Sequence, residues 1–148
     1  MAVQLTFDNP VFAQFAFYGT VCVLKTMAMS MITIYQRLTR QVVANMEDRL
    51  VKGQKTVFND VVVERTRRCH QNDIENVFPF ILVGGLYVLT GPDPWWAAFH
   101  FRLFTGCRLF HTIAYLFAIP QPARASMFGI GWFTIISMGV SVLLRGRF

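Results

Sequence analysis

The sequence has few charged residues for its length. Only 15% of its 148 residues are Asp, Glu, Lys or Arg, whereas soluble domains carry about 25%. Hydrophobic residues make up 54%, and the mean hydropathy is +0.42. This shortage of charge argues against an ordinary soluble domain and favours a membrane protein. At this length we expect one domain, covering residues 1–148.

Several kinds of site are also missing. The three cysteines, Cys22, Cys69 and Cys107, are an odd number without paired spacing, so no disulfide framework is indicated. Cys69 and His70 have no further ligands at usable spacing, so no metal is expected. A glycine-rich phosphate loop, which ATP would need, is absent. The cations are gathered in one polar stretch between apolar segments, which indicates loop topology and not a nucleic-acid partner.

Four apolar stretches are present, at about 10–35, 74–90, 95–119 and 126–144. Each approaches the length of about 20 residues that crosses a bilayer, the second only if its polar first turns are continuous with it. Asn9-Pro10 and Asp93-Pro94 each indicate a helix cap followed by proline in the first turn. We therefore predict an all-α integral membrane bundle with helices at about 10–35, 62–90, 94–119 and 124–145, and a cytosolic loop at about 36–61.

The distribution of cations predicts the orientation. Cytosolic loops carry an excess of Lys and Arg. Two of the fourteen cations lie at the C-terminus, three lie inside apolar segments, and nine lie in residues 36–73 and the turn at 120–125. The nine are Arg37, Arg40, Arg49, Lys52, Lys55, Arg65, Arg67, Arg68 and Arg124. We expect their side to be cytosolic and both termini to face the lumen.

Ionisable residues interrupt the apolar segments in two stripes. Arg68, Asn72 and Glu75 are spaced to share one helix face, and Arg108, His111 and Tyr115 are spaced in the same way. Ionisable side chains inside a membrane are functional candidates by default, because facing lipid is costly. Glu75 should face a polar cavity and a cationic partner. A purely structural ion pair, such as Arg108 with Glu75, is the alternative.

Other charged residues fit structural roles better. We expect Lys25, His100 and Arg102 to be structural or to snorkel, and Arg65 and Arg67 are equally compatible with contacts to lipid phosphates. The two stripes suit an anionic ligand that also carries an ammonium, because arginine binds carboxylates with forked donors and Glu75 can accept an amine. Glutathione meets this description, although composition alone does not select it.

The motifs of the chain closely resemble those of the microsomal glutathione transferases of the MAPEG superfamily, with the microsomal prostaglandin E synthases as close relatives. The resemblance is collinear over almost the whole chain. It rests on Val63-Glu64-Arg65-x-x-Arg68-x-His70-x-Asn72-Asp73-x-Glu75-Asn76-x-x-Pro79-Phe80, and on the segments 37–40, 87–94, 100–104, 110–116 and 120–125.

The resemblance implies a homotrimer in the endoplasmic reticulum membrane, with the mitochondrial outer membrane as a further location. Glutathione would be the co-substrate, bound between subunits near the cytosolic face, and a lipophilic electrophile or lipid hydroperoxide would arrive from the membrane lipid. Arg124 matches the arginine placed next to the thiol, and Tyr115 is the second candidate for catalysis. With Arg108 added from its stripe, the expected glutathione contacts are Arg37, Arg67, Arg68, His70, Asn72, Glu75, Arg108, His111 and Tyr115.

Two alternatives to a transferase with peroxidase activity remain open. The first is a glutathione-dependent prostaglandin isomerase; Asp48 matches an aspartate of those synthases, but Ala125 stands where they carry a serine. The second is a non-catalytic, lipid-presenting scaffold, which should have lost the Arg and Glu stripe that this chain keeps. Arg49 stands where mammalian transferases have a cysteine, so regulation through that thiol is not expected.

Overall fold

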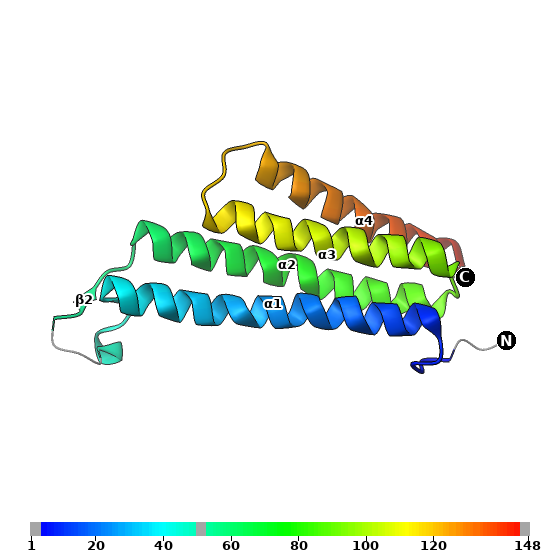
Figure 1. The fold of residues 1–148 in the computed structure, drawn as a ribbon, viewed down its shortest axis with the longest axis horizontal. Helices are drawn as coiled ribbons and strands as arrows, with labels where there is room; N and C mark the ends of the chain where they lie inside the picture. The colour runs from blue at the N-terminus through cyan, green and yellow to red at the C-terminus, as the bar shows by residue number, and fades with distance from the viewer. Residues whose placement is uncertain (1–3, 50–52, 146–148) are drawn as a thin grey trace.

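Four long helices form the molecule in the computed structural model, which describes residues 4–49 and 53–145. They are α1 (Pro10–Arg40), α2 (Val61–Leu89), α3 (Pro94–Leu116) and α4 (Ala123–Arg145). Successive helices run antiparallel, so both termini lie at one end of the bundle, the terminal end (Figure 1). The opposite end, the loop end, carries residues 41–49 and 53–60 and the α3–α4 turn. The predicted four-helix architecture is confirmed. Lys52 and Arg147, both used in the cation count, lie outside the described residues.

Side-chain caps begin the first three helices. The Oδ1 atoms of Asn9, Asp60 and Asp93 each accept two backbone N–H groups of the following turn, at 3.0 to 3.4 Å. These bonds satisfy donors that have no partner within the helix. The caps predicted at Asn9 and Asp93 are therefore confirmed.

Two helices end at positions other than those expected. α1 continues to Arg40 and ends where Gln41 adopts a left-handed conformation (φ 54°). α3 stops at Leu116, before the expected residue 119, because Ala118 is also left-handed (φ 54°). The N–H of Ile119 then donates to the carbonyl of Ala114 at 2.8 Å, which is the hydrogen bond of a Schellman motif.

The α1–α2 connection has some structure of its own. Strand β1 (Val42–Val43) pairs in parallel with strand β2 (Lys55–Thr56), and a short 3-10 helix, η1 (Met46–Asp48), lies between them. Arg40 Nε donates to both carboxylate oxygens of Asp60 at 2.8 and 3.0 Å. This ion pair joins the last residue of α1 to the cap of α2 and so closes the connection.

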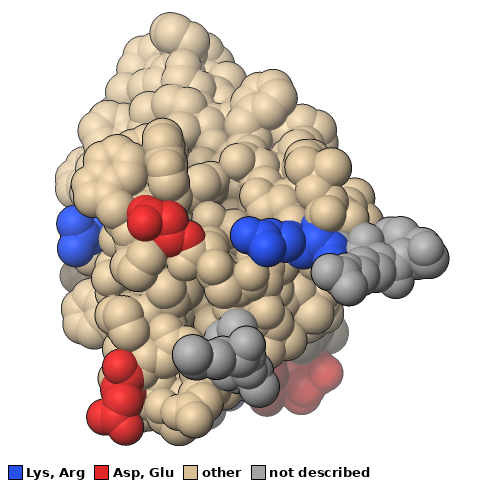
Figure 2. All heavy atoms as spheres, turned by 90° about the vertical axis from the view of Figure 1, so that its right-hand side faces the viewer, with Lys and Arg blue, Asp and Glu red and all other residues tan. Residues whose placement is uncertain are grey.

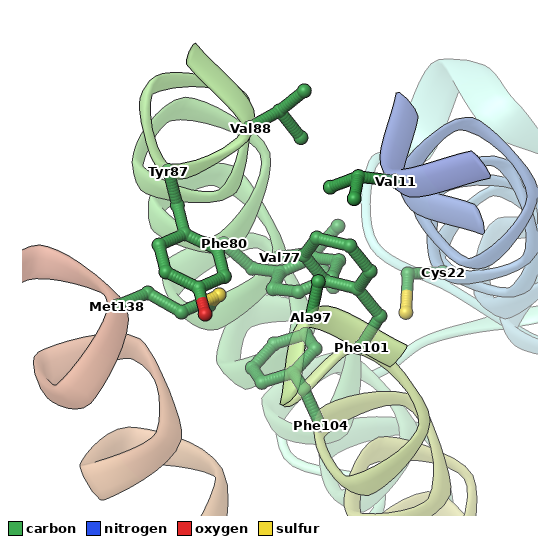
Figure 3. Packing of buried hydrophobic residues seen from close by; sticks show 10 residues of the cluster. All are labelled: Val11, Cys22, Val77, Phe80, Tyr87, Val88, Ala97, Phe101, Phe104 and Met138. Carbon is green, nitrogen blue, oxygen red and sulfur yellow. The ribbon is translucent and has the colours of Figure 1, made fainter. Parts of the chain in front are cut away.

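Aromatic rings fill the bundle core (Figure 3). Phe80 of α2 and Phe104 of α3 stack with ring centroids 4.0 Å apart, and both are fully buried. α1 approaches α2 closely at Gly84, where an added Cβ would lie 2.7 Å from the Phe15 ring. The close approach therefore requires glycine at this position.

The outer faces of the bundle remain apolar. Large side chains such as Phe17 and Met27 on α1 and Leu143 and Leu144 on α4 are more than half exposed. By length and composition α1 and α4 are apolar enough to cross a membrane. α3, with 23 residues, is long enough to span a hydrocarbon core of about 30 Å at about 1.5 Å per residue, but it carries internal charges.

Candidate functional site

A layer of charged side chains lies inside the bundle. Lys25 of α1 forms an ion pair with Asp73 of α2, whose side chain is completely buried. Arg108 of α3 is 1% exposed and donates from Nη2 to the Oδ1 atom of Asn72 at 3.1 Å. The layer thus brings two cations and one carboxylate together in the interior, which leaves a net positive charge there.

The position of the buried carboxylate corrects the sequence analysis. Glu75 was expected to face a polar cavity and a cation, or to pair with Arg108; instead it is exposed in the chain and accepts a hydrogen bond from Gln71 Nε2 at 3.0 Å. Glu75 is two positions after Asp73, which turns its side chain by about 200° around the helix relative to that of Asp73. Asp73 lies on the buried face of α2 with Cys69 and Val77. The four-residue spacing of these three positions is the sequence signal that could have predicted the burial of Asp73.

A second group of side chains surrounds the start of α4. Arg124 is the second residue of this helix, and its Cζ atom lies 4.8 Å from the centroid of the Tyr115 ring. The Tyr115 ring in turn packs against His111, with centroids 5.5 Å apart. Together with Asn72 and Arg108, these three residues are called the inner site here, and all five are among the candidate residues named from the sequence.

The inner site contains polar atoms without partners. Among the described residues, Arg108 Nε, His111 Nδ1 and Arg124 Nε are buried and make no hydrogen bond. Buried polar groups of folded proteins are nearly always paired, so a cluster of unpaired ones is an indication of a bound polar molecule. Two of these atoms belong to guanidinium groups, which donate only and therefore favour an acceptor, such as an anion.

The other predicted contacts lie on a different part of the surface. Arg67, Arg68 and His70 line an open groove of about 500 Å³ between α1 and α2, together with Ser30 and Thr33 of α1. Arg67 is held there by an ion pair with Glu64 at 2.7 Å.

Both sets include residues of α2, but the other helices that supply them lie at opposite edges of the bundle. α1, which forms one wall of the groove, and α4, which carries Arg124, lie at opposite edges (Figure 1). Arg37 and the exposed Glu75 belong to neither set; Arg37 lines a small hollow beside Asp48 at the loop end.

Three further charged residues have structural partners, as expected. Lys25 is paired with Asp73, and Arg102 Nε donates to the Tyr18 hydroxyl at 3.1 Å, which links α3 to α1. His100 bonds to the Trp96 carbonyl at 2.7 Å and to the Ser137 hydroxyl at 3.0 Å, which links α3 to α4.

The chain is thus a four-helix membrane protein with a buried cationic layer in its interior and a candidate site near the loop end of the bundle. Residues 15–144 match the sequence model of the MAPEG family, and the chain belongs to this family. The resemblance noted from the motifs is thereby confirmed.

Curated relatives agree with this assignment. The chain is 48% identical over 141 residues to microsomal glutathione S-transferase 1 of Homo sapiens, covering 92% of this chain and 91% of the relative. It is 47% identical over 145 residues to the Mus musculus protein of the same name, covering 95% and 93%. It is 34% identical over 143 residues to prostaglandin E synthase of Homo sapiens, covering 96% and 94%.

Proposed function

We propose that the chain is a membrane-bound glutathione transferase that conjugates the glutathione thiolate to lipophilic electrophiles. The observation that carries this proposal is the Arg124 guanidinium, held over the Tyr115 ring at the start of α4 with its Nε atom buried and unpaired. The relatives named microsomal glutathione S-transferase 1 support the activity, since they are more similar to the chain than prostaglandin E synthase is.

Arg124 would activate the thiol electrostatically. A free thiol is mostly protonated at neutral pH, and the thiolate is the nucleophile. The guanidinium charge and the positive end of the α4 dipole both favour the thiolate, so the thiol proton leaves to solvent. The sulfur electron pair then attacks the electrophilic carbon, a C–S bond forms, and the leaving group departs with its electron pair. The Tyr115 ring keeps the guanidinium in place.

The remaining predicted residues would bind the rest of glutathione. Arg67, Arg68 and Arg37 suit its two carboxylates, and Glu75 suits its ammonium, because forked and charge-assisted hydrogen bonds are the strong ones. Asn72, His70, Arg108 and His111 supply further polar contacts. Of these groups, His111 Nδ1 and Arg108 Nε still lack partners among the described residues.

We further propose that two neighbouring chains of a homotrimer share each site. The groove with Arg68 is built on α1 and α2, whereas Arg124 belongs to α4 at the opposite edge, so one small ligand touches both sets most easily where two chains meet. The exposed position of Glu75 is compatible with a ligand held against a neighbouring chain. The sites would lie towards the cytosol in the endoplasmic reticulum membrane.

The second substrate would enter from the lipid. The exposed apolar faces of α1 and α4 are compatible with a bilayer on those sides, where lipophilic molecules concentrate. With a lipid hydroperoxide, the thiolate would attack the terminal oxygen and release the alcohol, leaving glutathione as a sulfenic acid. A second glutathione would then displace water to give the disulfide, which balances the reduction.

One assay panel tests the proposal. Purified protein would be given glutathione with an aryl halide, a lipid hydroperoxide or a prostaglandin endoperoxide. We expect conjugation of the aryl halide to exceed isomerisation of the endoperoxide, because Ala125 cannot supply a hydroxyl. Dominant isomerisation would favour the synthase alternative, and inactivity with all three substrates despite glutathione binding would favour the non-catalytic scaffold. As a control, Ala125→Ser should raise isomerisation if the hydroxyl is what the chain lacks.

A further inference from the structure

A second hollow, which the proposed transferase reaction does not use, lies at the terminal end of the bundle. Its volume is about 610 Å³, and its walls come from the end of α2, the α2–α3 turn, the first turns of α3 and the last turns of α4. Trp96, in this hollow, and Tyr115, in the inner site, are nineteen residues apart on α3, which corresponds to about 28 Å along the helix. The two sites are thus separated by nearly the thickness of a hydrocarbon core.

The surroundings of this hollow are typical of a membrane interface. α2 ends, α3 begins and α4 ends here, and Trp95 and Trp96 are both more than half exposed. Trp95 also stacks on Phe99, with centroids 6.0 Å apart and planes 6° apart. Tryptophans gather where the hydrocarbon meets the headgroups. This end of the molecule shows mostly uncharged residues with scattered charges (Figure 2). The hollow therefore lies at the depth of lipid headgroups.

Two opposite charges line the hollow without neutralising each other. Asp93 comes from the α2–α3 turn and Arg145 from the last turn of α4. Asp93 caps α3 through its Oδ1 atom, and among the described residues neither side chain takes part in an ion pair. The hydrogen bond between His100 and Ser137 ties α3 to α4 in the lining, so the two charges are presented by elements that are fixed to each other.

We propose that this hollow binds the headgroup of a zwitterionic phospholipid. The phosphate would bond to the Arg145 guanidinium, and the ammonium would lie against the Asp93 carboxylate and the Trp96 ring. The acyl chains would follow the apolar side chains of Phe99 and Leu144, which line the same hollow. A headgroup with a phosphate but no ammonium would leave the Asp93 carboxylate without a positive partner. Phosphatidylcholine should therefore be preferred to phosphatidylglycerol.

The test measures which lipids the full-length protein retains. Protein would be incubated with equal amounts of phosphatidylcholine and phosphatidylglycerol, purified in detergent and examined by native mass spectrometry. We expect wild type to retain phosphatidylcholine with a preference of roughly tenfold, the scale of one charge-assisted contact. Arg145→Gln should reduce retention of both lipids. Asp93→Asn should raise phosphatidylglycerol towards the level of phosphatidylcholine, because the carboxylate that disfavours it is gone.

Matched controls separate this site from bulk lipid. Asp93→Asn keeps an oxygen that can cap α3, so the helix start is preserved. Asp8→Asn removes a carboxylate before α1, at the same end but outside the lining, and should leave the lipid ratio unchanged. Equilibrium dialysis with labelled glutathione should give wild-type affinity for every variant and so report an intact fold. The proposal is wrong if wild type shows no preference, if Arg145→Gln retains as much of both lipids as wild type, or if Asp93→Asn keeps the wild-type ratio.

Discussion

Arg124 is the side chain on which the proposed chemistry depends. Its guanidinium lies 4.8 Å from the Tyr115 ring centroid, and its Nε atom is buried without a partner in the described structure. We predict that Arg124→Ala raises the pH of half-ionisation of bound glutathione by about 1–3 units, the usual effect of an adjacent arginine. Conjugation at neutral pH should slow accordingly. Thiolate absorbance in the near ultraviolet, titrated in detergent, measures the ionised fraction.

The matched variant is Arg124→Lys. It keeps a positive charge but loses the planar fork, so it should retain part of the ionisation and part of the rate. Glutathione affinity should change little in both variants, because the carboxylate contacts remain. If Arg124→Ala instead abolishes binding while the residual complex ionises as in wild type, Arg124 is a binding residue and Tyr115 becomes the candidate for thiol activation.

The buried ion pair between Lys25 and Asp73 leads to a prediction about stability. Asp73 is fully buried, so Asp73→Asn would leave the Lys25 ammonium in the interior without a counter-charge. Removing one partner of a buried pair costs about 3–5 kcal/mol. We expect Asp73→Asn to lower the thermal unfolding midpoint in detergent by a corresponding amount.

The double variant Lys25→Met with Asp73→Asn is the control. Removing both charges should recover much of the lost stability, because the interior layer, which still contains Arg108, then returns to the net charge of wild type. Glu75→Gln, which changes the exposed carboxylate on the same helix, should have little effect on the unfolding midpoint. Equal loss from Glu75→Gln would mean that Asp73 has no special role in the interior.

At the scale of elements, the start of α2 depends on Asp60. The backbone N–H of Val63 and the Arg40 side chain both bond to its carboxylate and hold the pKa of Asp60 below its ordinary value. Such a group stabilises the fold above the unfolded-state pKa of about 3.9, and the contribution is lost as pH falls through the folded-state value. We predict that the stability advantage of wild type over Asp60→Asn is constant above about pH 5 and shrinks below about pH 4.

The measurement is a series of unfolding curves for both proteins over this pH range. Asn at position 60 keeps a capping oxygen but neither titrates nor pairs with Arg40, so it isolates the charge. Arg40→Gln should remove part of the same pH dependence, because the hydrogen bond from Val63 would remain. If the difference in stability between wild type and Asp60→Asn is the same at pH 3 and pH 7, the Asp60 charge does not stabilise the fold in the way predicted.

At the scale of the whole molecule, the proposed sharing of sites between chains can be tested by mixing two defective variants. An Arg68→Ala chain still supplies Arg124, and an Arg124→Ala chain still supplies Arg68. If neighbouring chains each contribute one of these residues, random mixing in a closed ring restores about one quarter of the sites. Each chain at a working site must be the variant that keeps the residue needed there, which has a chance of one half at each of the two positions. Co-expression should therefore give about one quarter of the wild-type conjugation rate, in addition to the activity of either variant alone.

Recovery would be absent if both residues of a site came from the same chain, because every chain in the mixture would carry one defect. The control is a mixture of the two variants that were purified separately and combined only after solubilisation. Because these chains assembled apart, the mixture shows the activity that does not depend on mixed assemblies. Chemical cross-linking of the same samples counts the chains per assembly and tests the homotrimer independently.

The orientation of the bundle gives a second prediction at this scale. Arg49 and Lys55, both exposed, lie in the α1–α2 connection, at the end of the bundle that we propose to be cytosolic. Trypsin added to intact microsomes should cut between residues 41 and 60 and leave the chain uncut after Arg145. Protection of the connection together with cutting near the C-terminus would reverse the orientation.

The sequence by itself determined the features that depend on local signals. The caps at Asn9 and Asp93 were predictable because a cap and its helix are adjacent in the chain. The number of helices followed from apolar stretches of spanning length, and the family followed from collinear motifs. The early end of α3 was not predicted, because a left-handed residue is usually glycine and here it is Ala118.

Only the tertiary structure decided which charged side chains are inside. Asp73 and Glu75 are two positions apart in one segment, and the rotation of α2 against α1 and α3 buries the first beside Lys25 and exposes the second. The partner of Arg108 was decided in the same way, since Asn72 reaches it only through the packing of α2 on α3. Spacing along a helix shows which residues share a face, but the burial of that face depends on neighbours that are distant in sequence.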